Sequence, residues 1–250
     1  MGHPAGIRAT KRQQLMKDAI LEHPRRIARI AGTLYLLEMM TGAISIYALG
    51  TIVVAGDAAA TAANTRSHES LLLLSFAFNL SQFACYIGVT GLLYWLLRPV
   101  NAVVSLLAAF FSLTGCIVGA VSCLFQIAPL IILRGPKYLT VFNSTQLDAL
   151  AFLLHRLYSQ CFEISFVFFG FYCLLIGYLV YKSGCVPRLI GAGMMLAGVL
   201  WLIFLWPPLA ESVFQYVVLA ALGELALALW LVIVGVDQQQ WKVLAARGPS

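Results

Sequence analysis

The sequence predicts an all-α fold, an integral membrane bundle of six transmembrane helices with both termini cytoplasmic. The mean hydropathy is +0.90. Of the 250 residues, 61% are hydrophobic and only 10% are charged, whereas about a quarter of a soluble domain is charged. The apolar residues form six blocks, each long enough to cross roughly 30 Å of hydrocarbon. Lys and Arg gather on one side of these blocks, as is typical of cytoplasmic segments.

The six blocks divide the chain into a basic N-terminal segment (1–27), a transmembrane domain (28–236) and a polar C-terminal tail (237–250). Helix-breaking or polar residues separate the blocks. The predicted spans are residues 28–54, 71–97, 102–133, 149–181, 189–206 and 213–236.

The first three spans are bounded by clear signals. Gly56 and Asp57 open a polar, Ala-rich loop that extends to Ser70 after the first span. Pro99 ends the second span, because proline cannot continue a helix. The third span is long enough to tilt, or to kink at Pro129.

The later spans have similar limits. Thr145, followed three residues later by Asp148, predicts a capping box at the start of the fourth span. Gly184 and Pro187 mark the turn before the fifth span, and Pro207 with Pro208 ends it. The small-residue motifs Gly115-x-x-x-Gly119 and Gly193-x-x-x-Ala197 predict close helix packing.

The distribution of positive charge orients the bundle. Seven of the sixteen Lys and Arg lie in residues 1–29, and with both termini inside the cytoplasmic segments carry twelve of the sixteen. We therefore expect the inner (plasma) membrane, with anionic lipids beside the N-terminal segment, and no nucleic-acid partner. Residues 11–23 fit either a short interfacial helix or a disordered tail.

Five stretches, in order along the chain, resemble a known family. They are RIAGTLYL (29–36), GDAAATAAN (56–64), VFFG with LLIGYL (167–179), KSGCVPR (182–188) and LGELALALW (222–230). They are similar to the bacterial multi-pass membrane proteins grouped as domain of unknown function 4386, over roughly residues 28–236. The resemblance implies a six-helix membrane fold and a bacterial source. It implies no activity and no functional residues.

Three carboxylates lie near the middle of predicted spans: Glu38, Glu163 and Glu224. A charge at the bilayer centre costs roughly 2.5–3.5 kcal/mol on insertion scales, so such residues usually face the bundle interior. Each lies about ten to fourteen residues from the start of its span, or about 15–21 Å along the helix. All three can therefore share one level of the membrane.

Two spans add polar stripes. The second span carries polar side chains at spacings of four, three and four, which places them on one helical face: Ser75, Asn79, Gln82 and Tyr86. The fourth carries a shorter stripe: Arg156, Gln160 and Glu163. His155 points about 80° away from Glu163 at 100° per residue. Gln126 lies in the third span.

These positions give the candidate residues for binding or for a proton pathway: Glu38, Asn79, Gln82, His155, Arg156, Gln160, Glu163 and Glu224. Arg156 is the one plausible intramembrane cation, so at most one or two of the three carboxylates can pair with it. We expect the others to be protonated near pH 7, because burial disfavours a charge.

Three functions are consistent with these residues. The first is a small proton-coupled transporter or permease, since an intramembrane carboxyl that exchanges protons can couple to transport. The second is an intramembrane enzyme acting on a lipid-like substrate, with Glu163 or His155 as general acid or base. The third is a structural or sensory subunit, in which polar side chains only hydrogen-bond neighbouring helices, at about 0.6–2 kcal/mol per bond.

Other chemistries are poorly supported by the sequence. One intramembrane His cannot supply both axial ligands of a membrane b-type haem, and His155 with Glu163 is a weak metal pair. Five of the six cysteines fall in apolar spans, which implies no disulfide framework. We expect no cofactor and no metal, and the small-molecule ligand is unknown.

Overall fold

The computed structural model describes residues 23–135, 139–213 and 218–247, and every regular element over these residues is helical. Most of the basic N-terminal segment, including the proposed interfacial helix, lies outside them. The elements in chain order are α2 (Pro24–Gly50), α3 (Ala58–Ser67), α4 (Glu69–Leu97), α5 (Ala102–Leu133), α6 (Ser144–Ser183), α7 (Arg188–Trp201), the 3-10 helix η2 (Leu202–Leu205), α8 (Pro207–Val213), α9 (Val218–Ile233) and α10 (Gln238–Arg247).

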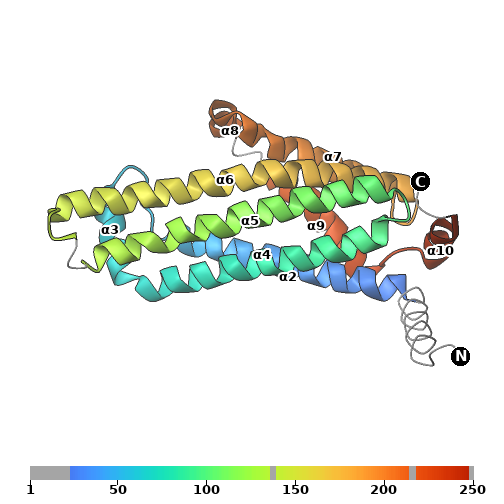
Figure 1. Ribbon diagram of the computed structural model, residues 1–250, viewed down its shortest axis with the longest axis horizontal. Helices are drawn as coiled ribbons and strands as arrows, with labels where there is room; N and C mark the ends of the chain where they lie inside the picture. Colours follow the sequence, from blue (N-terminus) through green and yellow to red (C-terminus); the bar gives the residue numbers. More distant parts are fainter. Residues whose placement is uncertain (1–22, 136–138, 214–217, 248–250) are drawn as a thin grey trace, which may run out of the picture.

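The long helices α2, α4, α5 and α6 lie side by side along the long axis of the molecule (Figure 1). Helix α7 packs on α6, and α9 crosses obliquely between α7 and α2. The helices therefore form a closed ring in the order α2, α4, α5, α6, α7, α9, because α9 also contacts α2. Helix α3 covers one end of this ring and α10 lies across the other.

The all-helical class of membrane protein is confirmed, but fewer than the six predicted spans are each a single membrane-crossing helix. Five helical segments in the described residues are long and apolar enough to cross a membrane: α2, α4, α5, α6 and Arg188–Leu205. The count reaches six if α9 and α10, which meet at a bend of 101°, form one span. The predicted third span matches α5 at both ends, and α5 continues through Pro129.

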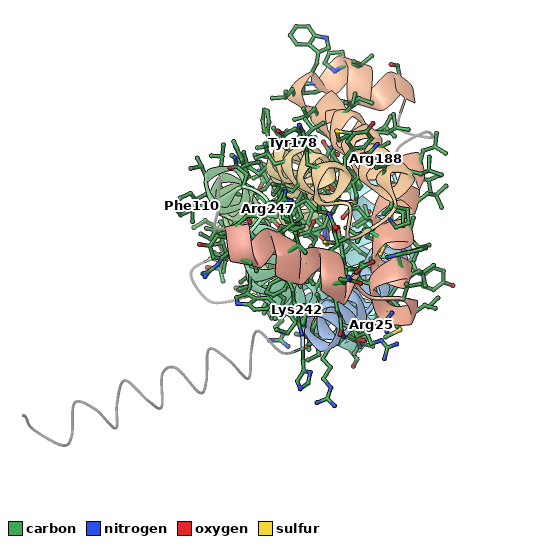
Figure 2. The ribbon with its side chains drawn as sticks, turned by 90° about the vertical axis from the view of Figure 1, so that its right-hand side faces the viewer. Arg25, Phe110, Tyr178, Arg188, Lys242 and Arg247 are labelled. Atoms are coloured by element: carbon green, nitrogen blue, oxygen red, sulfur yellow. The ribbon has the colours of Figure 1, made fainter. Side chains whose placement is uncertain are left out.

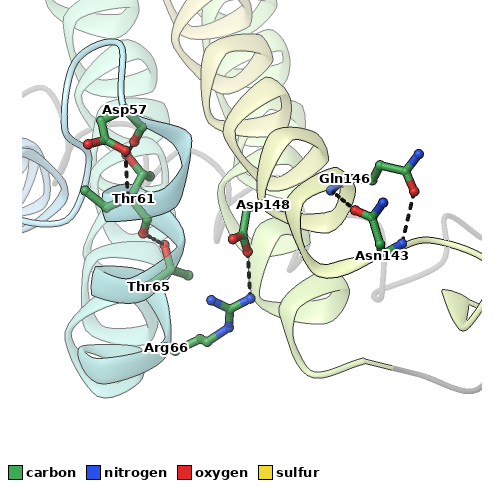
Figure 3. Close-up of polar contacts among 8 residues, drawn as sticks. Asp57, Thr61, Thr65, Arg66, Asn143, Gln146 and Asp148 are labelled. Atoms are coloured by element: carbon green, nitrogen blue, oxygen red, sulfur yellow. Dashed lines mark hydrogen bonds and ion pairs between the residues drawn. The ribbon is translucent and has the colours of Figure 1, made fainter.

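The loop predicted for residues 56–70 is wrong, because much of it is the helix α3 (Figure 3). The Asp57 side chain caps α3 by accepting a hydrogen bond from the Ala60 N–H (2.9 Å). Alanine has the highest helix propensity, so an Ala-rich polar stretch with such a cap favours a helix over a loop. Thr61 and Thr65 are buried on the side of α3 that packs against the bundle.

The predicted capping box of the fourth span is displaced by two residues. Asn143 caps α6 by accepting from the Gln146 N–H (2.9 Å), and Gln146 Oε1 accepts from the Asn143 N–H (3.0 Å). Asp148 instead pairs with Arg66 of α3 at 2.7 Å (Figure 3). The ion pair connects α3 to the start of α6, so the one carboxylate of the predicted motif pairs with another helix instead of capping α6.

The fifth span ends in a reversal. Helix α7 continues as η2 to Leu205, and Trp206 is extended (φ −127°, ψ 90°), as is favoured for a residue before proline. The fifth span ends before Pro207, as predicted, and Pro207 is also the first residue of α8. Proline is well suited to the first turn of a helix. The sixth predicted span begins at Val213, and its described part is α9 and the residues that follow.

Helix α10 folds the polar C-terminal stretch across the end of the bundle. Gly235 adopts a positive φ of 80° after α9, which a glycine does without strain, and Asp237 caps α10 by accepting from the backbone N–H of Gln239 (2.9 Å). Trp241 is buried, stacks on Trp95 with ring centroids 4.9 Å apart, and donates its indole N–H to a backbone carbonyl of α4 (2.9 Å). The described part of the predicted tail, residues 237–247, is therefore anchored to α4.

The two ends of the bundle differ in charge. Arg25, Arg188, Lys242 and Arg247 lie around the end covered by α10 (Figure 2). At the opposite end, the arginines of α3 and of the end of α5 are paired with Asp148 and Glu69. The excess of unneutralised positive charge lies at the α10 end, which is the end predicted to be cytoplasmic.

Helices α6 and α7 approach closely through two pairs of glycines that the sequence analysis missed. A Cβ on Gly191 would lie 2.7 Å from the Tyr181 backbone N and 2.8 Å from the Gly177 carbonyl oxygen, and Gly198 faces Gly170 in the same way. The predicted packing motifs also make contacts. Gly119 accommodates the Phe83 ring, and Gly193 faces α9 at Gly223. Small residues therefore set the spacing of these helices.

We expect Gly191→Ala to destabilise the protein by about 1–3 kcal/mol, because the methyl group would overlap backbone atoms that cannot move independently. The measurement is thermal unfolding in lipid nanodiscs. Gly91→Ala is the control, since nothing lies within 4 Å of a Cβ at that helical position. Equal melting temperatures for the two variants would contradict the close approach of α6 and α7.

Candidate functional site

A cleft opens between α2, α6, the end of α7 and α9. It consists of two adjoining cavities of about 550 Å³ and about 680 Å³. The residues that line both are Ile46, Phe162, Phe166, Trp201, Val218 and Ala221. The first cavity reaches Glu38 and Glu224, and the second extends toward α3 as far as Val53 and His155. Cavities of this size are typical of small-molecule sites.

Glu38 lines the first cavity and has one buried oxygen atom without a hydrogen-bond partner among the described residues. The residue is 6% exposed and lies in the middle of α2. Gln82 Nε2 of α4 donates to Glu38 Oε1 (3.2 Å), while Glu38 Oε2 and Gln82 Oε1 are buried with no hydrogen-bond partner among the described residues. A Cβ on Gly42 would lie 2.8 Å from the Gln82 amide, so the glycine allows Gln82 to reach Glu38.

Glu224 of α9 lines the same cavity, but its oxygens are fully engaged. Tyr35 Oη donates to Oε2 (2.5 Å), and Trp201 Nε1 donates to Oε1 (2.6 Å). Tyr86 Oη is a longer donor to Oε2 (3.4 Å). These donors come from α2, α7 and α4, so one buried carboxylate links four helices of the ring. Charge-assisted bonds of this kind are stronger than neutral ones.

Asn79 lies in the interior of the bundle and lines neither cavity. Its Nδ2 donates to Gln126 Oε1 of α5 (3.0 Å) and to Tyr158 Oη of α6 (2.7 Å). Gln126 donates in turn to Ser75 Oγ (2.8 Å), which contacts Ser45 of α2. The predicted stripe on the second span is therefore buried, and its Asn79 portion connects helices.

The residues predicted on the fourth span separate into two groups. His155 is 2% exposed, lies 3.4 Å from Thr65 Oγ1 through Nε2, and has no described partner at Nδ1. Glu163 is half-buried and accepts from Gln160 Nε2 (3.1 Å). His155 and Glu163 both line the second cavity. Arg156 and Gln160 are exposed.

Arg156, the cation expected from the sequence beside the carboxylates, is exposed and lines neither cavity. Neither cavity has a Lys or Arg among its described lining residues, although Glu38 and Glu224 line the first and Glu163 the second. The described lining of the cleft therefore contains carboxyl groups but no Lys or Arg to pair with them. In the described residues, no group of three or more His, Cys, Asp or Glu could hold a metal ion.

Two partners of the carboxylates were not identified from the sequence, Tyr35 and Trp201. Both are aromatic residues with a polar group, and such groups usually find a hydrogen-bond partner when buried. Tyr35 and Trp201 could have been proposed as partners by asking which Tyr or Trp of each apolar span lies at the same membrane depth as a carboxylate. The sequence alone did not show that α2, α7 and α9 are neighbours.

We expect Tyr35→Phe to lower the stability by about 1–3 kcal/mol, because it removes the short hydrogen bond to a carboxylate that stays buried. Thermal unfolding in nanodiscs measures the effect. Tyr47→Phe is the matched control on the same helix, since Tyr47 is 77% exposed. A Tyr35→Phe protein as stable as this control would show that the bond contributes nothing.

Comparison with known proteins identifies the family but no activity. A relative from Archaeoglobus fulgidus, an uncharacterized protein, is 26% identical over 151 residues, which are 60% of this chain and 76% of the relative. No solved structure matches the chain. The model of one family, described as a domain of unknown function (DUF4386), matches residues 30–235. The chain therefore belongs to the DUF4386 family.

Proposed function

We propose that this membrane protein is a carrier for a small molecule, and that ligand and protons compete for Glu38 in the cleft. The observation that carries the proposal is the buried Glu38 oxygen without a partner beside a cavity of about 550 Å³. An unsatisfied buried acceptor costs about 1–3 kcal/mol. A proton or a bound ligand would recover that cost, which couples the two.

The extent of the cleft supports a carrier function. From Glu38 it runs toward the α3 end. Toward the α10 end, α2 and α9 are in close contact, since a Cβ on Gly32 would lie 2.8 Å from the Ala228 carbonyl oxygen and from Leu231 Cβ. A site that extends toward one end and is closed toward the other is close to one of the two states that a carrier must adopt. Separation of α2 from α9 at Gly32 would produce the other.

The orientation is part of the proposal. We place the α10 end in the cytoplasm at the inner (plasma) membrane, with the exposed Arg25, Arg188, Lys242 and Arg247 next to anionic lipid headgroups (Figure 2). The cleft would then extend toward the outer side of the membrane. The alternative of a purely structural subunit predicts paired polar groups and no cavity, and Glu38 argues against it.

An intramembrane enzyme is the second candidate, because His155 and Glu163 line the same cavity and His155 Nδ1 lacks a described partner. The hydrogen bond found for His155 is to Thr65, not to a carboxylate. A lipid hydrolase would release fatty acid from phospholipid proteoliposomes, and His155→Ala would abolish the release. We expect no release above that of protein-free liposomes.

The carrier proposal is tested by the accessibility of the cleft from each side of the membrane. A cysteine replaces Ala221, which lines both cavities. Right-side-out and inside-out vesicles are treated with a membrane-impermeant maleimide, and modification of the peptide containing residue 221 is quantified by mass spectrometry. We expect modification from both sides, because a carrier exposes its site alternately.

The control is Ala77→Cys, since Ala77 is exposed on α4 and would face lipid, where a thiol does not ionise and does not react. Modification of residue 221 from one side only would exclude carriage and leave a binding protein. Equal modification at residues 77 and 221 would mean that the cleft is not an aqueous path.

A further inference from the structure

We propose that the ligand of the cleft is a protonated hydrophobic amine, an ammonium group with N–H donors attached to an aromatic or alkyl body. The proposal rests on the cleft being the ligand site proposed above. Glu38 and Gln82 line the first cavity, and each has a buried acceptor atom, Oε2 and Oε1, without a hydrogen-bond partner among the described residues, which favours a ligand that donates hydrogen bonds. The Gln82 amide group is already oriented by its bond to Glu38.

The carboxyl groups of the site favour a cation, because an ammonium group next to a buried carboxyl stabilises its ionised form. Glu38 and Glu224 line the first cavity, Glu163 lines the second, and no Lys or Arg appears among the described lining residues of either. An anion would be repelled by an ionised carboxylate and would gain no opposite charge from a protonated one. Glu224 already accepts from Tyr35 and Trp201. Glu38 is therefore the carboxylate with capacity left for a ligand.

Aromatic side chains form the walls around these acceptors. The first cavity is lined by Tyr86, Phe162, Phe166, Phe169 and Trp201. Phe166 and Trp201 stack with ring centroids 4.4 Å apart. Aromatic faces attract ammonium groups by about 0.5–2 kcal/mol each, depending on desolvation. They also cover the apolar body of a ligand, whereas a small hydrated cation would gain little from them.

The geometry argues against a bare metal ion. Calcium takes six to eight oxygen ligands, and among the described lining residues of the first cavity only Glu38 and Gln82 have a buried side-chain oxygen without a partner. The volume of about 550 Å³ is instead suited to an organic molecule. Ile46, Tyr47 and Val218 are exposed lining residues, so the cavity has an apolar edge by which a hydrophobic amine can enter.

The test uses three naphthalene compounds of nearly equal size and different charge: 1-naphthylmethylamine, 1-naphthalenemethanol and 1-naphthaleneacetate. Binding to the full-length protein in nanodiscs is measured by equilibrium dialysis, with protein-free nanodiscs correcting for partition into lipid. We expect saturable binding of the amine at one site, binding of the alcohol weaker by about tenfold or more, and no binding of the carboxylate.

Two variants test the site independently. Glu38→Gln should weaken binding of the amine by about tenfold, to the affinity of the alcohol, because it removes the charge and keeps the shape. Ala221→Phe should abolish binding by filling the cavity. Glu69→Gln and Ala77→Phe are the controls, an exposed carboxylate at the α3 end and an exposed position on α4, and should leave binding unchanged.

The outcomes separate the two proposals. Equal affinities for the amine and the alcohol would overturn the assignment of an amine. The same conclusion would follow if the Glu38→Gln variant bound the amine as tightly as the unmodified protein. If Glu38→Gln does not fold, the relative affinities of the three compounds for the unmodified protein still test the assignment of an amine. No amine binding together with labelling of residue 221 from both sides would indicate a carrier for another ligand class. Amine binding with labelling from one side would support the ligand class and exclude carriage.

Discussion

The Glu224 carboxylate is held by side chains of three other helices, and the cleft depends on this arrangement. The hydrocarbon core of a membrane supplies no water, so a buried carboxylate must find its hydrogen bonds within the protein. Tyr35, Tyr86 and Trp201 supply them from α2, α4 and α7. Together they hold α9 obliquely across the gap between α2 and α7, where it forms one wall of the cleft.

Glu38 lines the same cavity under the same constraint, but only one of its oxygens has a hydrogen-bond partner among the described residues. The contrast between the two carboxylates gives them separate roles. Glu224 is a fixed part of the structure, and its replacement should disturb helix packing. Glu38 can change partners, and aromatic walls around it favour an organic cation. The exposed Arg156 does not neutralise either one.

The sequence predicted the features that depend on composition and helical periodicity. The bounds of α5, the buried stripe of α4 and the polar mid-span carboxylates follow from residue spacing. Features that depend on which helices are neighbours could not be predicted from the sequence. Tyr35 and Trp201 meet Glu224 only because α9 crosses obliquely, and the glycines at 170, 177, 191 and 198 have a meaning only in the α6–α7 pair. Helix α3 was missed because its polar composition resembles that of a loop.

The most direct measurement is a high-resolution electron cryo-microscopy map of the full-length protein in lipid nanodiscs, without added ligand. The account predicts an open cleft between α2, α6 and α9, with water or ligand density within hydrogen-bonding distance of Glu38 Oε2. A map in which protein side chains fill that cleft and Glu38 Oε2 bonds to another residue of the chain would contradict it.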